Sequence, residues 1–164
     1  MDFTPIKIAN ECREMSKNIM PVPPDVDATR LFWAIAGVES SFGINCKPRH
    51  EAAYDVGGMY DNAIMAPLLA RFGREAACSY GPWQIMFVNA PTGFLPTDFD
   101  DLRHCSIASI AFLNRLLRTF RPKNLAEIGN CWNGGHVYQK PYPVTIQQYV
   151  GKLETAYNTP MPTE

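Results

Sequence analysis

Apolar residues recur at steps of three and four along most of this sequence, which is the spacing of one face of an α-helix. The longest such segment, residues 98–121, predicts a central buried helix. Further helices are predicted over residues 8–19, 28–40, 61–74, 81–91, 124–132 and 145–157. No segment shows the sustained apolar–polar alternation of a half-buried strand, so the pattern predicts a mainly α fold. Residues 42–58 are expected to form a long loop that has room for a short hairpin.

Short polar residues at the ends of these segments fit helix caps. Asp25 or Asp27 is expected to cap the helix over 28–40, and Asn124 is expected to cap the helix over 124–132. Such side chains accept a hydrogen bond from a free backbone N–H. Thr145 is the expected cap of the last helix.

Size and composition favour one globular domain. The chain has 164 residues, of which 46% are apolar and 19% charged. We therefore expect one domain over residues 1–158, followed by a flexible tail over 159–164. The net charge of -1 argues against a protein that mainly binds nucleic acid or anionic lipid. No apolar run approaches the ~20 residues that a membrane span needs.

The first residues and the cysteines of the sequence indicate the cellular compartment in which the protein is expected to fold. The sequence starts without the basic and apolar segments of a secretory signal. An odd number of cysteines without a CxxC pair favours reduced, buried thiols, although a bridge between Cys46 and Cys78 remains open. The five are Cys12, Cys46, Cys78, Cys105 and Cys131.

Glu39 breaks the apolar pattern of its helix. It shares one face with Leu31, Phe32, Ile35 and Ala36. Apolar surroundings and the negative end of the helix both disfavour the ionised carboxylate, so both raise its pKa. A carboxylic acid that stays protonated near neutral pH is what general-acid cleavage of an acetal requires. The alternative is that Glu39 lies at a solvated helix end.

Four motifs resemble those of the soluble lytic transglycosylases, members of the lysozyme-like superfamily. Glu39-Ser40-Ser41-Phe42-Gly43 resembles the family's E-S-x-F motif, and Gly81-Pro82-Trp83-Gln84-Ile85-Met86 its G-L-M-Q-I-M segment. Cys131-Trp132-Asn133-Gly134-Gly135 is similar to A-Y-N-x-G, and Tyr149-Val150 to a later tyrosine-valine pair. The motifs occur in family order across most of the chain.

The resemblance implies a lysozyme-like fold and a role for each matched residue. Glu39 is the single catalytic acid and base, while Gln84 and Asn133 line the sugar groove and bind the glycan. Tyr149 places its hydroxyl near the glutamate. Ser40 supports the loop that follows the glutamate and is also counted among the substrate-binding residues. The alternatives are that Gln84 and Asn133 are ordinary caps and that Tyr149 is a half-buried core aromatic.

The sequence departs from the family at two kinds of position. More residues separate Glu39 from Gln84 in this sequence than in the family, so we expect an inserted loop over residues 45–78. Trp83 and Trp132 replace other family residues, and each either stacks on a sugar ring or packs in the core.

The expected insertion is rich in titratable groups and bears on the reaction. A transglycosylase needs one carboxyl group, whereas a hydrolase needs a second one, ~6.5–9.5 Å away if inverting and ~5 Å if retaining. Asp55 and Glu51 are the candidates for that second carboxylate. Alternatively, Arg49, Glu51 and Asp55 form an ion-paired scaffold of the loop.

The function expected from the sequence is cleavage of the β-1,4 bond between N-acetylmuramic acid and N-acetylglucosamine in peptidoglycan. Lytic transglycosylase is the first hypothesis and muramidase the second. A non-catalytic cell-wall-binding or virion module would not need Glu39, and a zinc site built on Cys46 and His50 lacks a second half with suitable spacing. No cofactor and no metal are implied, and a monomer is expected. The missing signal would fit a phage-derived lysin that a holin releases or a virion carries.

Overall fold

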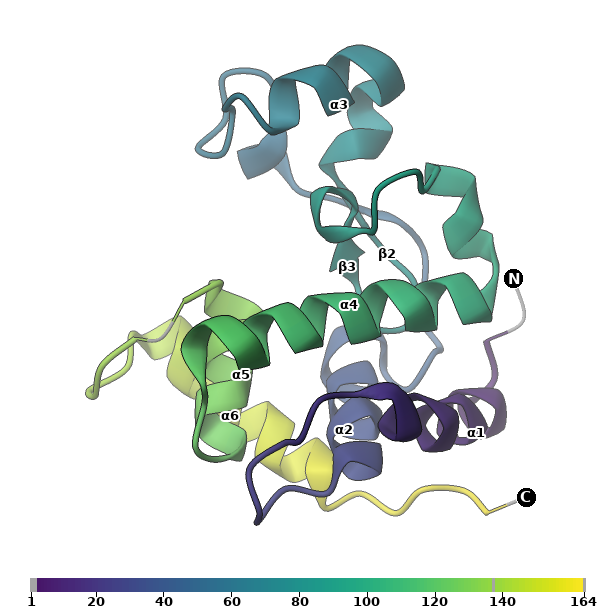
Figure 1. The fold of residues 1–164 in the computed structure, drawn as a ribbon, viewed down its shortest axis with the longest axis vertical. Coiled ribbons are helices and arrows are strands. Elements are labelled where there is room, and N and C mark those ends of the chain that lie inside the picture. The colour runs from purple at the N-terminus through teal and green to yellow at the C-terminus, as the bar shows by residue number, and fades with distance from the viewer. Residues whose placement is uncertain (1–2, 137, 164) are drawn as a thin grey trace.

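The computed structural model describes residues 3–136 and 138–163, and this part of the chain is mainly helical (Figure 1). Short 3-10 turns and three short strands connect the α-helices. The α-helices are α1 (Pro5–Met15), α2 (Ala28–Ser40), α3 (Met65–Phe72), α4 (Leu102–Phe120), α5 (Leu125–Gly134) and α6 (Val144–Tyr157).

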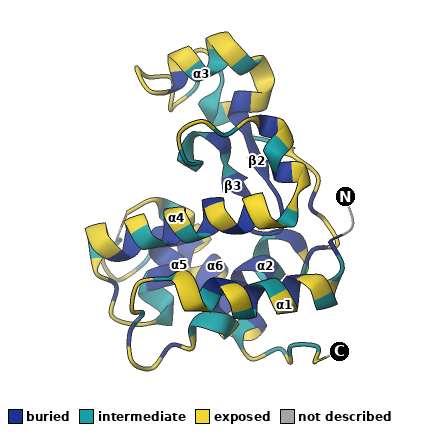
Figure 2. Ribbon diagram, turned by 45° about the vertical axis from the view of Figure 1, so that its right-hand side comes forward, coloured by how far each residue is buried: buried dark blue, intermediate teal, exposed yellow. Residues whose placement is uncertain are grey.

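The helices form a lower body, and the segment that follows α2 forms an upper part. In Figure 1, α1, α2, α5 and α6 lie below α4, while α3 and the strands lie above it. Helix α2 packs against α1 and α6, and α5 packs against α6. Leu31, Phe32 and Ile35 of α2 are fully buried, so α2 is the centre of the core. Figure 2 shows buried residues along the helices of the lower body and mainly exposed ones on α3.

A small antiparallel sheet joins the two parts, whereas the sequence predicted at most a short hairpin within residues 42–58. Its strands are β1 (Arg49–His50), β2 (Cys78–Tyr80) and β3 (Ile85–Met86), in the order β1-β2-β3. The predicted helix over residues 81–91 is wrong. Gly81 and Gln84 have φ of 72° and 45°, outside the helical region, and they form the turn between β2 and β3. A Cβ at Gly81 would come within 2.5 Å of the Cys105 sulfur, so the turn also needs glycine for space.

The caps agree with the sequence at two helices and differ at two others. The Asp27 and Asn124 side chains accept from backbone N–H groups of α2 and α5, as predicted. Helix α4 starts later than predicted because Asp101 caps it, after a separate 3-10 turn. Thr145 is not the cap of α6, since that helix already starts one residue earlier, after Pro143.

The C-terminal segment contacts the helices, and the cysteine thiols are buried. The tail that was expected to be flexible contacts the body at two points: Trp33 donates to the Thr159 carbonyl at 3.2 Å, and Arg13 donates to the Pro162 carbonyl at 2.8 Å. All five cysteines are buried free thiols, so the bridge between Cys46 and Cys78 is not formed. Burial raises the pKa of the Cys46 thiol to about 11. Within the described residues, no helix is long and apolar enough to cross a membrane.

Candidate active site

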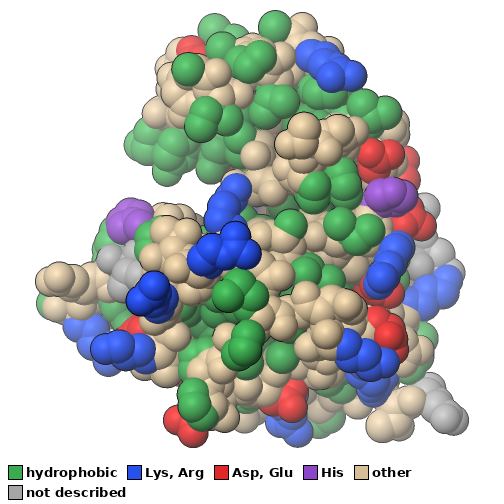
Figure 3. Space-filling model, viewed as in Figure 1, with side chains coloured by type: hydrophobic (Ala, Val, Ile, Leu, Met, Phe, Trp, Pro, Cys, Tyr) green, Lys and Arg blue, Asp and Glu red, His purple; other side chains and the backbone are tan. Residues whose placement is uncertain are grey.

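A cavity of about 770 Å³ lies between the upper part and the lower body. Figure 3 shows the corresponding hollow, open on the left-hand side of the molecule. Its walls come from the end of α2, the segment after it, the β2–β3 turn, and α4 and α5. The polar and aromatic residues among its lining are Glu39, Arg49, Glu51, Tyr54, Tyr60, Ser79, Gln84, Asn89, Phe112, Arg115, Thr119, Phe120, Trp132, Asn133 and His136.

The turn after Glu39 is built to end α2 abruptly. Ser41, Phe42 and Gly43 all have positive φ, and the Phe42 N–H donates back to the Ala36 carbonyl at 3.0 Å. The Phe42 ring stacks on Trp33 with 4.2 Å between ring centroids. This turn leaves Glu39 in the last turn of α2, at the wall of the cavity.

Ser40 holds the same turn from inside the protein. Its hydroxyl donates to the Ala36 carbonyl at 2.9 Å and accepts from the Gly43 N–H at 3.0 Å. The side chain is buried and does not line the cavity among the residues described there. Its contacts are therefore those of a support for the loop, and direct binding of substrate, the role also expected of Ser40, is not available to it in this position.

Glu39 is nearly enclosed, with only 11% of its side chain exposed. The Tyr149 hydroxyl, from α6, donates to Glu39 Oε1 at 2.8 Å, and Arg49 Nη2 lies 3.8 Å from Oε2. Burial raises the pKa of Glu39, and the hydrogen bond from Tyr149, the charge of Arg49 and the Trp132 side chain partly oppose it. The net effect is a raised pKa, which keeps the carboxyl protonated to higher pH than an exposed glutamate.

The two candidates for a second carboxylate lie in different places. Glu51 lines the same cavity as Glu39, and Arg49 contacts both, with its Nε 2.6 Å from Glu51 Oε1. Asp55 instead pairs with His50, whose Nε2 is 2.8 Å from Asp55 Oδ2, and lines a separate hollow. Of the two candidates, Glu51 therefore lies at the cavity and Asp55 does not; the Arg49–Glu51 pair of the alternative scaffold forms, while Asp55 pairs with His50.

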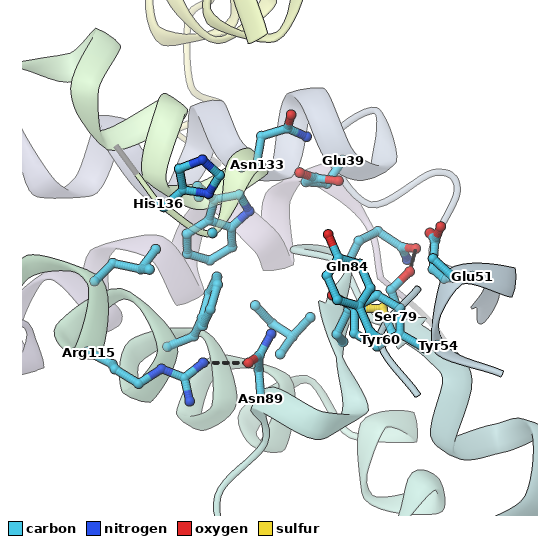
Figure 4. Close-up of a pocket in the computed structure, with 18 of the residues that line it drawn as sticks. Glu39, Glu51, Tyr54, Tyr60, Ser79, Gln84, Asn89, Arg115, Asn133 and His136 are labelled. Atoms are coloured by element: carbon cyan, nitrogen blue, oxygen red, sulfur yellow. Dashed lines mark hydrogen bonds between the residues drawn. The ribbon is translucent and has the colours of Figure 1, made fainter. Parts of the chain in front are cut away.

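Gln84 and Asn133 both line the cavity. Figure 4 shows Asn133 on the same side as Glu39, with Gln84 across from them. The Gln84 amide is held by its own turn, since it donates to the Gly81 carbonyl at 2.9 Å and accepts from the Ser79 hydroxyl at 2.8 Å. Gln84 is thus both a turn-stabilising residue and part of the cavity wall.

The two tryptophans of the motifs have different surroundings. Trp83 is fully buried and donates its indole N–H to the Phe32 carbonyl at 2.9 Å, so of the two alternatives it takes the core position. Trp132 lines the cavity but is only 6% exposed, and it packs edge-on against Phe112. Neither presents an open ring face of the kind that stacks on a sugar.

Sequence reasoning missed two features of the cavity. The rings of Tyr54 and Tyr60 pack against each other at a tilt of 33°, with 4.6 Å between centroids, and both residues line the cavity. Arg115 of α4 donates to the Asn89 side chain, and both residues lie on the side of the cavity away from Glu39 (Figure 4). The two tyrosines were visible as aromatic residues in a segment otherwise rich in polar groups, whereas the Arg115–Asn89 contact joins residues distant in the sequence and left no local signal.

The loop after α5 is also fixed by a residue that the sequence did not point out. Asn130 is fully buried, and its amide donates to the Tyr138 carbonyl at 3.0 Å and accepts from the Tyr138 N–H at 3.2 Å. The Tyr138 ring lies over Gly134, where a Cβ would come within 2.5 Å of it. This loop carries His136 to the edge of the cavity.

The arrangement fits acid–base chemistry on a polar, extended ligand. It offers one enclosed proton donor, a hydroxyl bound to it, amide side chains, and aromatic walls. Within residues 3–136 and 138–163, no three His, Cys, Asp or Glu side chains cluster as metal ligands do. Comparison with protein-family models, with curated proteins and with solved structures finds no match to this chain.

Proposed function

We propose that this chain is a peptidoglycan lytic transglycosylase with a lysozyme-like fold. The observation that carries the proposal is the Glu39 carboxyl group, which is enclosed at the cavity wall, has a raised pKa and accepts a hydrogen bond from Tyr149. The four motifs support the same function. Their residues Glu39, Gln84 and Asn133 line one cavity, and the hydroxyl of Tyr149 donates a hydrogen bond to Glu39. The segment over residues 45–78 is then an insertion that forms the upper wall.

The proposed reaction uses Glu39 twice. The protonated carboxyl group gives its proton to the oxygen that bridges N-acetylmuramic acid and N-acetylglucosamine, and the bond from that oxygen to C1 breaks. The N-acetyl group of the substrate stabilises C1. The Glu39 carboxylate then takes the proton of the muramic 6-hydroxyl, whose oxygen bonds to C1 and closes the 1,6-anhydro ring.

Tyr149 fits a role in the middle of this cycle. Its hydroxyl donates to Glu39 Oε1, so it stabilises the carboxylate that remains after the first proton transfer. The pKa of Tyr149 itself is raised well above its usual value by burial and by the neighbouring Glu39, so the hydroxyl keeps its proton and remains a donor.

A muramidase is the second candidate function, and one observation favours it. Glu51 lines the same cavity, and Arg49 contacts both Glu51 and Glu39. A second carboxylate in that position is what a hydrolase would use to activate water or to attack C1. The roles of Glu51 in the two reactions differ enough to be separated by mutation.

The test is release of soluble fragments from purified peptidoglycan by the wild type and three variants. We expect Glu39→Gln to lower the rate by at least about 100-fold, the scale of a lost general acid, with an unchanged circular dichroism spectrum. Glu154→Gln is the matched control, because Glu154 is exposed on α6 and is not among the lining residues. Wild-type release from Glu39→Gln would refute the proposal.

The third variant, Glu51→Gln, separates the two reactions. In a transglycosylase we expect a change below about tenfold, because Glu51 takes no proton in the cycle. A loss on the order of 10³-fold would favour the muramidase. No release by the wild type, from walls that a known lysozyme digests, would favour a non-catalytic binding module.

A further inference from the structure

The charged side chains of the cavity are unevenly distributed. The acidic side chains among the lining residues are Glu39 and Glu51, and Arg49 contacts both. Arg115 lines the same cavity, and in the described part of the chain it forms no ion pair. Figure 4 shows Arg115 on the far side of the pocket from Glu39 and Glu51. That part of the cavity therefore carries an uncompensated positive charge.

Arg115 is held in place by neutral groups. Its guanidinium donates to the Asn89 side-chain oxygen, and its Cζ lies 5.2 Å from the centre of the Phe112 ring. Asn89 ends the 3-10 turn after β3, so the contact joins the β2–β3 region to α4. A guanidinium has five N–H donors in a rigid fork, and the bond to Asn89 uses one side of it. A fork that is positioned but left without an acid suits a planar anion.

We propose that Arg115 forms a subsite for a carboxylate carried by a substituent of the glycan. This inference rests on the proposed function, and it adds that the cavity selects anionic β-1,4-linked glycans over neutral ones. In peptidoglycan the muramic acid bears a lactyl group whose carboxyl is either free or extended by a peptide with its own carboxylates. A neutral glycan such as an N-acetylglucosamine oligomer offers no partner to Arg115.

The test compares two ligands that share one glycan chain and differ in the charge of the lactyl group. One is a tetrasaccharide of alternating N-acetylglucosamine and N-acetylmuramic acid with free lactyl carboxylates, and the other is the same compound with those groups converted to methylamides. Both are titrated calorimetrically into Glu39→Gln, which binds without cleaving. We expect the acid to bind about fivefold tighter than the amide at low salt, the scale of one partly exposed charge-assisted contact. The difference should shrink at high salt.

The control uses a second arginine of the same helix. In the Glu39→Gln background, Arg115→Gln should bind both ligands equally, and Arg115→Lys should keep part of the preference because it keeps the charge without the fork. Arg118→Gln should keep the full preference, since Arg118 is exposed on α4, contacts Met20 and is not among the lining residues.

Two results would overturn the inference while the proposed function stands: equal binding of both ligands to the parent, or a preference that survives in Arg115→Gln. If neither ligand binds the parent, the glycan-cleaving function itself fails and the inference fails with it.

Discussion

Replacing Gly37 with alanine tests whether the turn that positions Glu39 is as tightly packed as the structure indicates. Gly37 lies inside α2, where alanine normally stabilises a helix by about 1 kcal/mol. A Cβ at this position would, however, come within 2.5 Å of the Phe42 ring and 3.1 Å of the Ala156 Cβ. Phe42 is held by its stacking on Trp33, so it cannot move away without disturbing the turn after Glu39.

The two effects have opposite signs, and the contact distances indicate which is larger. Overpacking in a closed core costs about 1–3 kcal/mol, and a contact with a ring that cannot retreat belongs at the upper end, about 3 kcal/mol. Subtracting the gain of about 1 kcal/mol in helix propensity leaves a net loss of about 2 kcal/mol. For a chain of this size we expect the melting temperature to fall by about 4–8 °C.

Gly151→Ala is the matched control for this variant. Gly151 lies inside α6, and a Cβ built there meets nothing within 4 Å. The same substitution should therefore raise the melting temperature by about 2–4 °C. Thermal unfolding followed by circular dichroism measures both. A Gly37→Ala variant that gains stability as Gly151→Ala does would refute the packing argument.

Three further predictions concern the titration of Glu39 and the cavity wall. Tyr149→Phe removes a hydrogen bond that lowers the pKa of Glu39, so the alkaline limb of the pH profile of kcat/KM should move to higher pH; an unmoved limb would contradict this. Burial raises the pKa of Glu39 above 4.5, its ordinary value. The protonated Glu39 side chain therefore makes its full contribution to the free energy of unfolding below pH 4.5, and this contribution is lost as the pH rises through the folded-state pKa. In urea unfolding, the free energy of unfolding of Glu39→Gln should therefore rise relative to that of the wild type between pH 4 and pH 8. A difference between the two free energies that stays constant over this range would count against a raised pKa of Glu39. Tyr60→Ala should raise KM about tenfold with little change in kcat, because its partly exposed ring lines the cavity and is available to a sugar, whereas Tyr142→Ala, which is not among the lining residues, should change neither.

The helical part of the site could be predicted because its signals are local. The apolar face of α2 and the Asp27 cap are both visible within a few residues, and they place Glu39 at the end of a buried helix. The position of Tyr149 beside Glu39 came only from the resemblance, because the two residues lie on helices far apart in the sequence. Periodicity gives the face of a helix but not the helix against which that face packs.

The upper wall could not be predicted for a related reason. The segment over 81–91 begins with a Gly-Pro pair that suits a helix start. Gly81 and Gln84 nevertheless have positive φ, and the strand that follows them, β3, pairs with β2. That pairing also involves Arg49, which comes from the other side of α3 in the sequence. The placement of Arg49 and Glu51 at the cavity, and of Asp55 outside it, follows from this long-range pairing and has no local signature.

The most direct test of the account is the chemistry of the ends that the protein leaves on peptidoglycan. Muropeptides released from purified walls would be analysed by mass spectrometry, with Glu39→Gln as the inactive control. We expect 1,6-anhydro-muramyl ends, one water lighter than reducing ends, and none from Glu39→Gln. Reducing ends from the wild type would contradict the transglycosylase mechanism and make Glu51 the second carboxylate of a muramidase, and equal release by Glu39→Gln would contradict the role of Glu39 itself.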